Sequence, residues 1–141
     1  MEQRVNFITL GVEDLALMRA FYKEKLRWTP MQDQESIVFF RLNGLVLALY
    51  PKKELADDIG ISQDGAGFKN FSLSINFRTE AEVDEMYKEL VGRGVTGVRA
   101  PEKVFWGGYR GYVADPEQNY WELAFNPFLA LDQDGNVASP T

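Results

Sequence analysis

The chain has 141 residues, a net charge of −6, and neither histidine nor cysteine. Without cysteine it has no disulfide framework and no thiolate chemistry, and without either residue it lacks the usual ligands of transition metals. The acidic balance has no Lys/Arg-rich stripe, which argues against a nucleic-acid partner, and no apolar run approaches the roughly 20 residues that span a membrane.

The first half of the chain shows a strand, a helix, a strand hairpin and a short helix. The elements predicted from periodicity are a strand over 5–12, a helix over 15–26, strands over 36–41 and 45–50, and a helix over 52–59. Glu13-Asp14 is a polar cap for the first helix, and Asn43-Gly44 is a strong hairpin signal. Pro51 and Gly60 delimit the short helix because proline favours a first turn and glycine ends one.

The second half follows the same plan. Its predicted elements are a strand over 70–77, a helix from Thr79 to Leu90, an extended segment over 95–105, and strands over 109–114 and 120–125. Turn chemistry joins the last three, at Gly107-Gly108 and at 115–119. The tail from Asp132 onward is predicted to be loose and polar.

The two halves are also similar in sequence. The segment 6–10 leads into Tyr22, the segment 70–74 leads into Tyr87, and the two tyrosines lie 65 positions apart (87 minus 22). The sequence therefore contains two copies of a β-α-β-β-β module, and such a repeat suggests a cleft between the halves. We expect a single domain over 1–141, with module 1 at about 4–59, a linker at 60–68, module 2 at about 69–128 and a polar tail at 129–141.

The repeated motifs resemble those of the vicinal-oxygen-chelate superfamily, which includes glyoxalases, bleomycin-resistance proteins and extradiol dioxygenases. The resemblance rests on the runs 8–15 and 115–123, and the run 106–112 resembles a glyoxalase-related bacterial subgroup. It implies an α+β fold in which the two modules form a cupped eight-stranded mixed sheet with helices outside. It also implies a homodimer, because bleomycin-resistance proteins pair their cups.

Family members usually hold a divalent metal in the cup, with ligands from the first and fourth strands of each module. The four corresponding positions here are Phe7, Leu47, Ser72 and Glu122. Hydrocarbon and a hydroxyl stand at three of them, whereas catalytic zinc sites use about three protein ligands. We therefore predict no metal site and no cofactor.

Glu122 is the candidate catalytic residue. Strand alternation places it on one face with Tyr120, Ala124 and Asn126, and a carboxylate in the cup could act as an acid, a base or a hydrogen-bond acceptor. The alternative is a structural carboxylate bonded to Ser72 or Tyr109, since enclosed charges need partners.

The other candidate ligand-binding residues are polar or aromatic. With Phe7, Leu47, Glu122 and Asn126 they comprise Thr9, Arg41, Ser72, Ser74, Asn76, Trp106 and Tyr109. The hydroxyls and the amide could orient a ligand or satisfy one another. Trp106 and Tyr109 flank a glycine turn and could stack a planar or cationic ligand, or fill a core or dimer interface.

These observations favour a metal-independent protein that binds or sequesters a small organic compound in an aromatic-lined cup. The alternative is a glyoxalase-type lyase or isomerase that uses Glu122 as acid or base, or an atypical divalent metal. A third possibility is a degenerate scaffold that only contacts other proteins. The N-terminal residues do not resemble a secretory signal, so we expect a cytoplasmic protein with no membrane partner.

Overall fold

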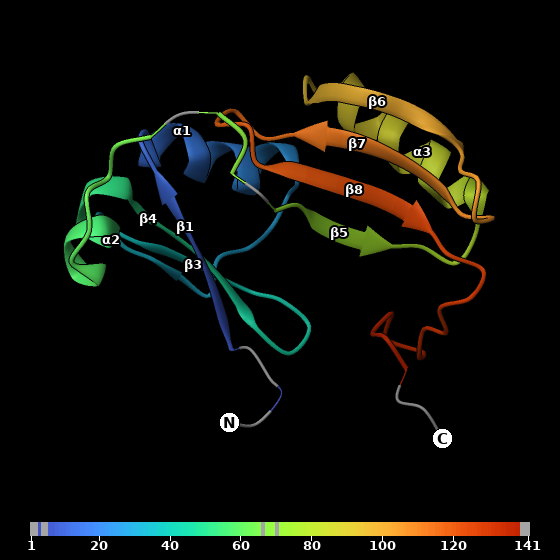
Figure 1. The fold of residues 1–141 in the computed structure, drawn as a ribbon, viewed down its shortest axis with the longest axis horizontal. Coiled ribbons are helices and arrows are strands. Elements are labelled where there is room, and N and C mark those ends of the chain that lie inside the picture. The colour runs from blue at the N-terminus through green and yellow to red at the C-terminus, as the bar shows by residue number, and fades with distance from the viewer. Residues whose placement is uncertain (1–2, 4–5, 66, 70, 139–141) are drawn as a thin grey trace. The chain divides into compact units, whose positions relative to one another are not determined.

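A computed structural model describes residues 3, 6–65, 67–69 and 71–138. The chain forms two compact units, residues 1–67 and 68–141, and each contains one four-stranded mixed sheet with helices (Figure 1). The eight strands and the repeated β-α-β-β-β order confirm the predicted α+β class. In the described part of the chain, no helix has the length and apolar character needed to cross a bilayer.

The first unit contains four strands, two α-helices and one π-helix. In chain order they are β1 (Phe7–Val12), α1 (Leu15–Ala20), the π-helix η1 (Phe21–Lys25), β2 (Gln32–Asp33), β3 (Val38–Arg41), β4 (Val46–Pro51) and α2 (Lys52–Ile59). The strand order is β1-β4-β3-β2, in which only β1 and β4 run parallel. A right-handed crossover through a helix is the usual way to join such a parallel pair.

The predicted helix over 15–26 is not continuous. Asp14 caps its start, as predicted, because its Oδ1 accepts a 2.9 Å bond from the Leu17 amide. At Phe21 the α-helix passes into the π-helix, and the Leu26 amide donates to the Phe21 carbonyl five residues back. The widened turn leaves both Phe21 and Tyr22 buried.

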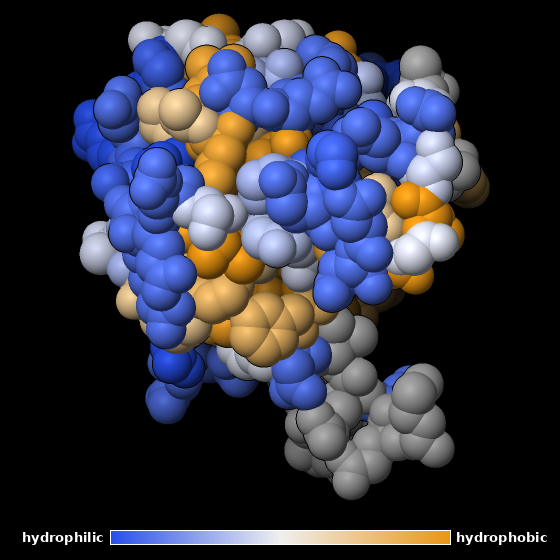
Figure 2. Space-filling model, turned by 90° about the vertical axis from the view of Figure 1, so that its left-hand side faces the viewer, coloured by the Kyte–Doolittle hydropathy of each residue, from blue (hydrophilic) through white to orange (hydrophobic). Residues whose placement is uncertain are grey.

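The core of the first unit lies between the sheet and α1. Its largest fully buried side chains are Met18, Tyr22, Phe40, Leu47 and Leu49. The Tyr22 ring lies 5.8 Å from Phe40 and 5.6 Å from Trp28, centroid to centroid. Figure 2 shows the side of this unit on which α2 lies, where hydrophobic residues are exposed between hydrophilic ones. Large exposed apolar residues of this unit include Phe7, Leu17, Ile59 and Ile61.

The second unit contains four strands and one long helix. These are β5 (Leu73–Asn76), α3 (Glu80–Gly92), β6 (Thr96–Lys103), β7 (Tyr109–Ala114) and β8 (Tyr120–Phe125), with strand order β5-β8-β7-β6. Thr79 and Glu82 form a complete capping box, which confirms the predicted helix start. Because Gly97 has no side chain, the Tyr87 ring of α3 can approach β6: a Cβ there would lie 2.4 Å from the Tyr87 hydroxyl.

Two expectations for the second unit need correction. The strand predicted over 70–77 is shorter, because β5 begins at Leu73 and Asn70 lies outside the described residues. The tail is not loose up to Ala138: Asp132 accepts amide bonds from Asp134 and Asn136, and Leu131 pairs with Val137. An Asp-X-X-Gly turn closes this segment through bonds from its own backbone.

Candidate functional site

One face of the second sheet is covered by α3. The opposite face of this sheet is the second open face. Successive strand residues point to opposite faces, so Tyr109 and Tyr112 lie on different sides of β7. Tyr109 donates a 2.5 Å hydrogen bond to Asp84 of α3, which places it on the helix side. The second open face therefore carries Ser74, Asn76, Arg110, Tyr112, Tyr120 and Glu122.

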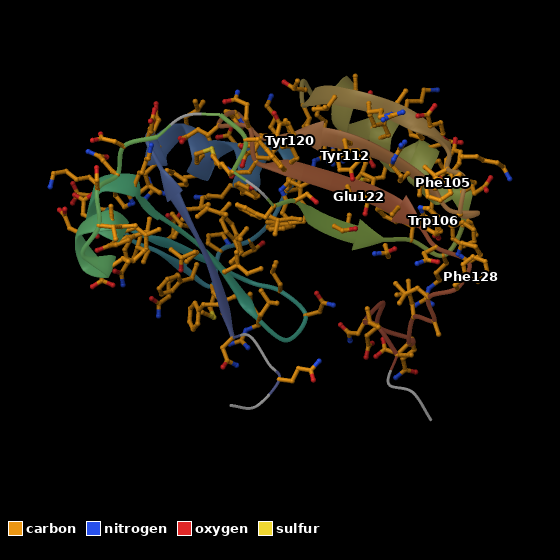
Figure 3. All side chains as sticks on the ribbon, viewed as in Figure 1. Phe105, Trp106, Tyr112, Tyr120, Glu122 and Phe128 are labelled. Carbon is orange, nitrogen blue, oxygen red and sulfur yellow. The ribbon has the colours of Figure 1, made fainter. Side chains whose placement is uncertain are left out.

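Glu122 lies at the centre of a hydrogen-bonded group on this face. In β8 it is directly opposite Ser74 of β5 on one side and Tyr112 of β7 on the other. The Ser74 Oγ donates to Oε1 at 2.8 Å, and the Tyr112 Oη donates to Oε2 at 3.1 Å. Asn76 donates to the Ser74 Oγ at 3.5 Å. Figure 3 shows Tyr112 and Glu122 side by side on neighbouring strands.

Tyr112 is suited to remain a proton donor to this carboxylate. Burial raises the pKa of Tyr112, and the neighbouring Glu122 charge and hydrogen bond raise it further. The Arg110 guanidinium lies 5.9 Å from the Tyr112 ring centroid and also donates to Glu102 at 3.3 Å. The phenol is therefore held between a carboxylate and a cation that has its own acidic partner.

The structure changes the predicted partners of Glu122. They are Ser74 and Tyr112, whereas the reading of Glu122 as a structural carboxylate named Ser72 or Tyr109; Ser72 precedes β5 and is exposed. Tyr109 is on the helix side, so its predicted ligand-binding role is wrong for the second open face. The prediction placed it near the glycine turn without counting its register against β8.

Trp106 lies in the β6–β7 turn and is 41% exposed. A Cβ built on Gly108 would be 2.1 Å from the indole, so the ring occupies the space of the missing side chain. Gly108 continues the alternation of Arg110 and Tyr112, which places this indole on the second open face. Phe105, Trp106 and Phe128 gather at the end of the sheet where β8 ends (Figure 3). Asn126 caps the turn there, accepting a 2.9 Å bond from the Phe128 amide.

The corresponding face of the first sheet, called here the first open face, has a different chemistry and is closed at its centre, where Ala48 is buried, and near α2, which packs against Gly11. Thr9 is opposite Ala48, and Ala48 is opposite Phe39, in the register positions that Ser74, Glu122 and Tyr112 occupy in the second sheet. The Phe7 and Phe39 rings contact each other there, 5.8 Å apart. Arg41 shares the strand face of Phe39 and donates to the Met31 sulfur at 3.3 Å.

The match of Leu47 to Glu122 is wrong by one residue. Leu47 is opposite Ile8 and Phe40 on the helix-covered face and is fully buried. Ala48 is the true counterpart of Glu122. The hairpin turns were aligned by residue type, but their lengths differ, and a shift of one residue moves a side chain to the other face.

The donor groups do not fit a resident divalent metal. Both oxygens of Glu122 already accept hydrogen bonds from hydroxyls. Among the described residues, no three His, Cys, Asp or Glu side chains are grouped so as to hold a cation. A single carboxylate with neutral hydroxyls leaves most of the charge and coordination of Mg²⁺ or Zn²⁺ unsatisfied.

A family model described as Glyoxalase/Bleomycin resistance protein/Dioxygenase superfamily matches residues 4–123. The chain belongs to this superfamily. A crystal structure of a glyoxalase-related enzyme from Fulvimarina pelagi is 36% identical, covers 99% of this chain and 100% of its own, and has a TM-score of 0.87. Lactoylglutathione lyase from Agrobacterium tumefaciens is 24% identical over 89% of this chain and 96% of its own, with a TM-score of 0.64. Metallothiol transferase FosB from Staphylococcus saprophyticus is 26% identical over 87% of this chain and 77% of its own.

For this superfamily member, sequence reasoning missed Arg110 on the second open face, and it considered Tyr112 only as aromatic surface, without its hydrogen bond to Glu122. A usable signal existed. The tight turn over 115–119 pairs Ala114 with Tyr120. Moving two residues away from the turn on each strand brings Tyr112 opposite Glu122. Cross-strand neighbours share a face, so the hydroxyl partner follows once the register is fixed.

Proposed function

We propose that this superfamily member binds a small organic molecule on the second open face, without a resident metal ion. The observation that supports the proposal is the group Ser74–Glu122–Tyr112, which lies on the face that also presents the Trp106 indole. A few fixed polar groups beside aromatic surface are typical of small-molecule sites, because the polar groups orient a ligand and the rings supply contact area.

The polar group is pre-arranged rather than assembled by the ligand. Ser74 and Tyr112 each come from a strand directly paired with β8, so the backbone ladder fixes their distance from Glu122. Each Glu122 oxygen has one intramolecular donor and can accept a further bond from a ligand. Binding to such a site avoids part of the ordering cost that a flexible carboxylate would incur.

A thermal-shift screen across aromatic drugs and small aldehydes tests this proposal. A ligand at 100 times its Kd stabilises the folded state by about 2.7 kcal/mol, a clear shift in melting temperature. The shift should be strongly reduced in Trp106→Leu, and also in Glu122→Gln for a ligand that carries a positive charge. Asp84→Asn is the matched control, since Asp84 also accepts a tyrosine hydroxyl but lies on the helix side. A shift that is unchanged in Glu122→Gln and Trp106→Leu contradicts the proposed location.

The second candidate function is a glyoxalase-type lyase or isomerase. The Tyr112–Glu122 pair supports it, because a hydrogen-bonded acid and base on an accessible face could move a proton at a bound substrate. Glu122→Gln should then abolish turnover of a substrate found in the screen while binding persists. If turnover requires an added divalent metal and is lost on chelation, the metal-independent proposal is wrong.

We also propose a cytoplasmic homodimer, on the resemblance to proteins that pair their cups. Sedimentation equilibrium of the purified chain tests the dimer directly: a mass of about 32 kDa, twice 16.1 kDa, is expected. A monomer mass across the micromolar range contradicts it.

A further inference from the structure

On the second open face, the two arginines pair with Glu102, whereas Glu122 forms no ion pair among the described residues. Arg99 and Arg110 both contact Glu102, with shortest distances of 2.6 Å and 3.3 Å. These two arginines hold the pKa of Glu102 below its usual value, through their hydrogen bonds and charges. The cations on this side of the sheet are thus already directed to a carboxylate.

Glu122 has no such partner among the described residues. The donors that reach it are the hydroxyls of Ser74 and Tyr112, which are neutral. The Arg110 guanidinium lies 5.9 Å from the Tyr112 ring centroid, and its ion pair is with Glu102. A half-buried carboxylate with only neutral donors is stabilised further by a cation, because charge-assisted bonds are about twice as strong as neutral ones.

The indole of Trp106, from the β6–β7 turn, covers Gly108 directly before β7, on the face that strand alternation assigns to Arg110 and Tyr112. Gly108, which the ring covers, is four residues from Tyr112, so their backbones are about 14 Å apart at the rise of a β-strand. The π-face of tryptophan attracts cations as well as planar rings.

We propose that the ligand of the second open face is a planar organic cation, with its charged group at Glu122 and its flat part toward Trp106. This inference rests on the proposed function and adds the chemical class of the ligand. The rival class is an organic anion that would displace Glu102 from Arg99 and Arg110. The two classes make opposite predictions for one set of probes.

Three naphthalene probes of similar size separate the classes: 2-naphthylmethylammonium, 2-naphthylmethanol and 2-naphthoate. Equilibrium dialysis against the full chain, read by naphthalene absorbance, gives the three dissociation constants. The ammonium compound should bind about tenfold more tightly than the alcohol, and the carboxylate more weakly still. The preference for the cation should shrink as salt is raised, because exposed charge attraction is screened.

Two substitutions locate the effect. Glu122→Gln should reduce the ammonium affinity to that of the alcohol while the alcohol affinity changes less than about twofold. Gly108→Ala should weaken all three probes, because its methyl group displaces the indole from its position. Asp84→Asn, on the helix side, should leave all three constants unchanged.

Each outcome bears on a stated claim. Equal or tighter binding of 2-naphthoate, or a cation preference that survives in Glu122→Gln, overturns the assignment of a cationic ligand while leaving binding on this face intact. Failure of all three probes to bind overturns the assignment of a planar cationic ligand, whereas the proposed function is overturned only if the thermal-shift screen also gives no ligand whose binding depends on this face. The wild-type comparison alone decides the class even if Glu122→Gln fails to fold.

Discussion

The open faces of the two sheets share one backbone arrangement and differ in chemistry. In the first, threonine, alanine and phenylalanine occupy three neighbouring positions on β1, β4 and β3. In the second, serine, glutamate and tyrosine occupy the same positions on β5, β8 and β7. A carboxylate bonded to two hydroxyls in one module thus corresponds to a methyl group beside a phenyl ring in the other.

The helix-covered faces do not diverge in this way. Leu49 and Leu123 occupy equivalent positions, and both are buried, at 0% and 2% exposure. At this position both modules keep a buried leucine, because loss of apolar contact in a packed core is costly. On the opposite faces the two modules differ in polarity at the three neighbouring positions.

The largest expected effects test the similarity of the two cores. Leu49→Ala and Leu123→Ala should each lower the free energy of unfolding by about 2–5 kcal/mol, because both leave a cavity among buried side chains. Urea denaturation followed by circular dichroism measures the loss. Leu17→Ala, at a 48% exposed position of α1, is the control and should cost less. A marked inequality between the two core variants would show that the modules are not equivalent on this face.

The next prediction converts the first open face toward the second. Ala48 is 1% exposed, so Ala48→Glu should destabilise the protein by about 1–3 kcal/mol through an enclosed carboxylate without a tyrosine donor. Adding Phe39→Tyr should recover part of the loss, because Phe39 is directly opposite Ala48 as Tyr112 is opposite Glu122. A double-mutant cycle in urea gives the coupling energy. A coupling energy of zero would mean that the opposite positions of residues 39 and 48 are not sufficient for a tyrosine–glutamate hydrogen bond.

The hydroxyl donors of the second face should each contribute less. Tyr112→Phe and Ser74→Ala remove one hydrogen bond to Glu122, and each should cost about 0.5–1.5 kcal/mol. Phe39→Tyr alone is the matched control and should stay within about 0.5 kcal/mol of wild type. Chemical denaturation at pH 7 measures all three. If Tyr112→Phe is as neutral as the control, the Tyr112–Glu122 bond does not stabilise the fold.

The smallest effect concerns Tyr109 on the helix side. Its hydrogen bond to Asp84, with burial, raises the pKa of Tyr109 from 10.0 to about 12. A raised folded-state pKa contributes stability that is present below about pH 10 and is lost as pH rises toward about 12. The stability gap between wild type and Tyr109→Phe should therefore be constant up to pH 10 and narrow above it. A difference in unfolding free energy that increases above pH 10 would contradict the hydrogen bond between Tyr109 and Asp84.

Local sequence signals predicted most elements closely. The bounds of α2, β7 and β8 match the expected ranges, because proline, glycine and tight turns delimit them. The π-helix at Phe21 was not predicted, since apolar spacing over 15–26 fits an α-helix equally well. The ordered segment after Leu131 was also missed, because its pairing is a contact between residues that local patterns treat as a turn.

The candidate site was predicted in part. Ser74 and Asn76 were predicted to satisfy one another or a ligand, and they do hydrogen-bond to each other; alternation also placed Thr9 on the opposite face from the buried Leu10. Leu47 was matched to the wrong face, Tyr109 lies on the helix side, and the bonds of Glu122 to Ser74 and Tyr112 were not predicted. Each error is a matter of register, which hairpin lengths determine and residue types only suggest.

The sequence by itself determined the superfamily, the doubled module and the loss of nitrogen and sulfur ligands, because these follow from which residues are present and how they repeat. Only the tertiary structure decided which residues meet. Glu122 contacts Ser74 and Tyr112 because parallel and antiparallel neighbours bring residues 48 and 10 positions away into one row. The Ser74 contact depends on a parallel pairing over a long separation, which no local pattern encodes, whereas the Tyr112 contact follows from a hairpin once its register is known.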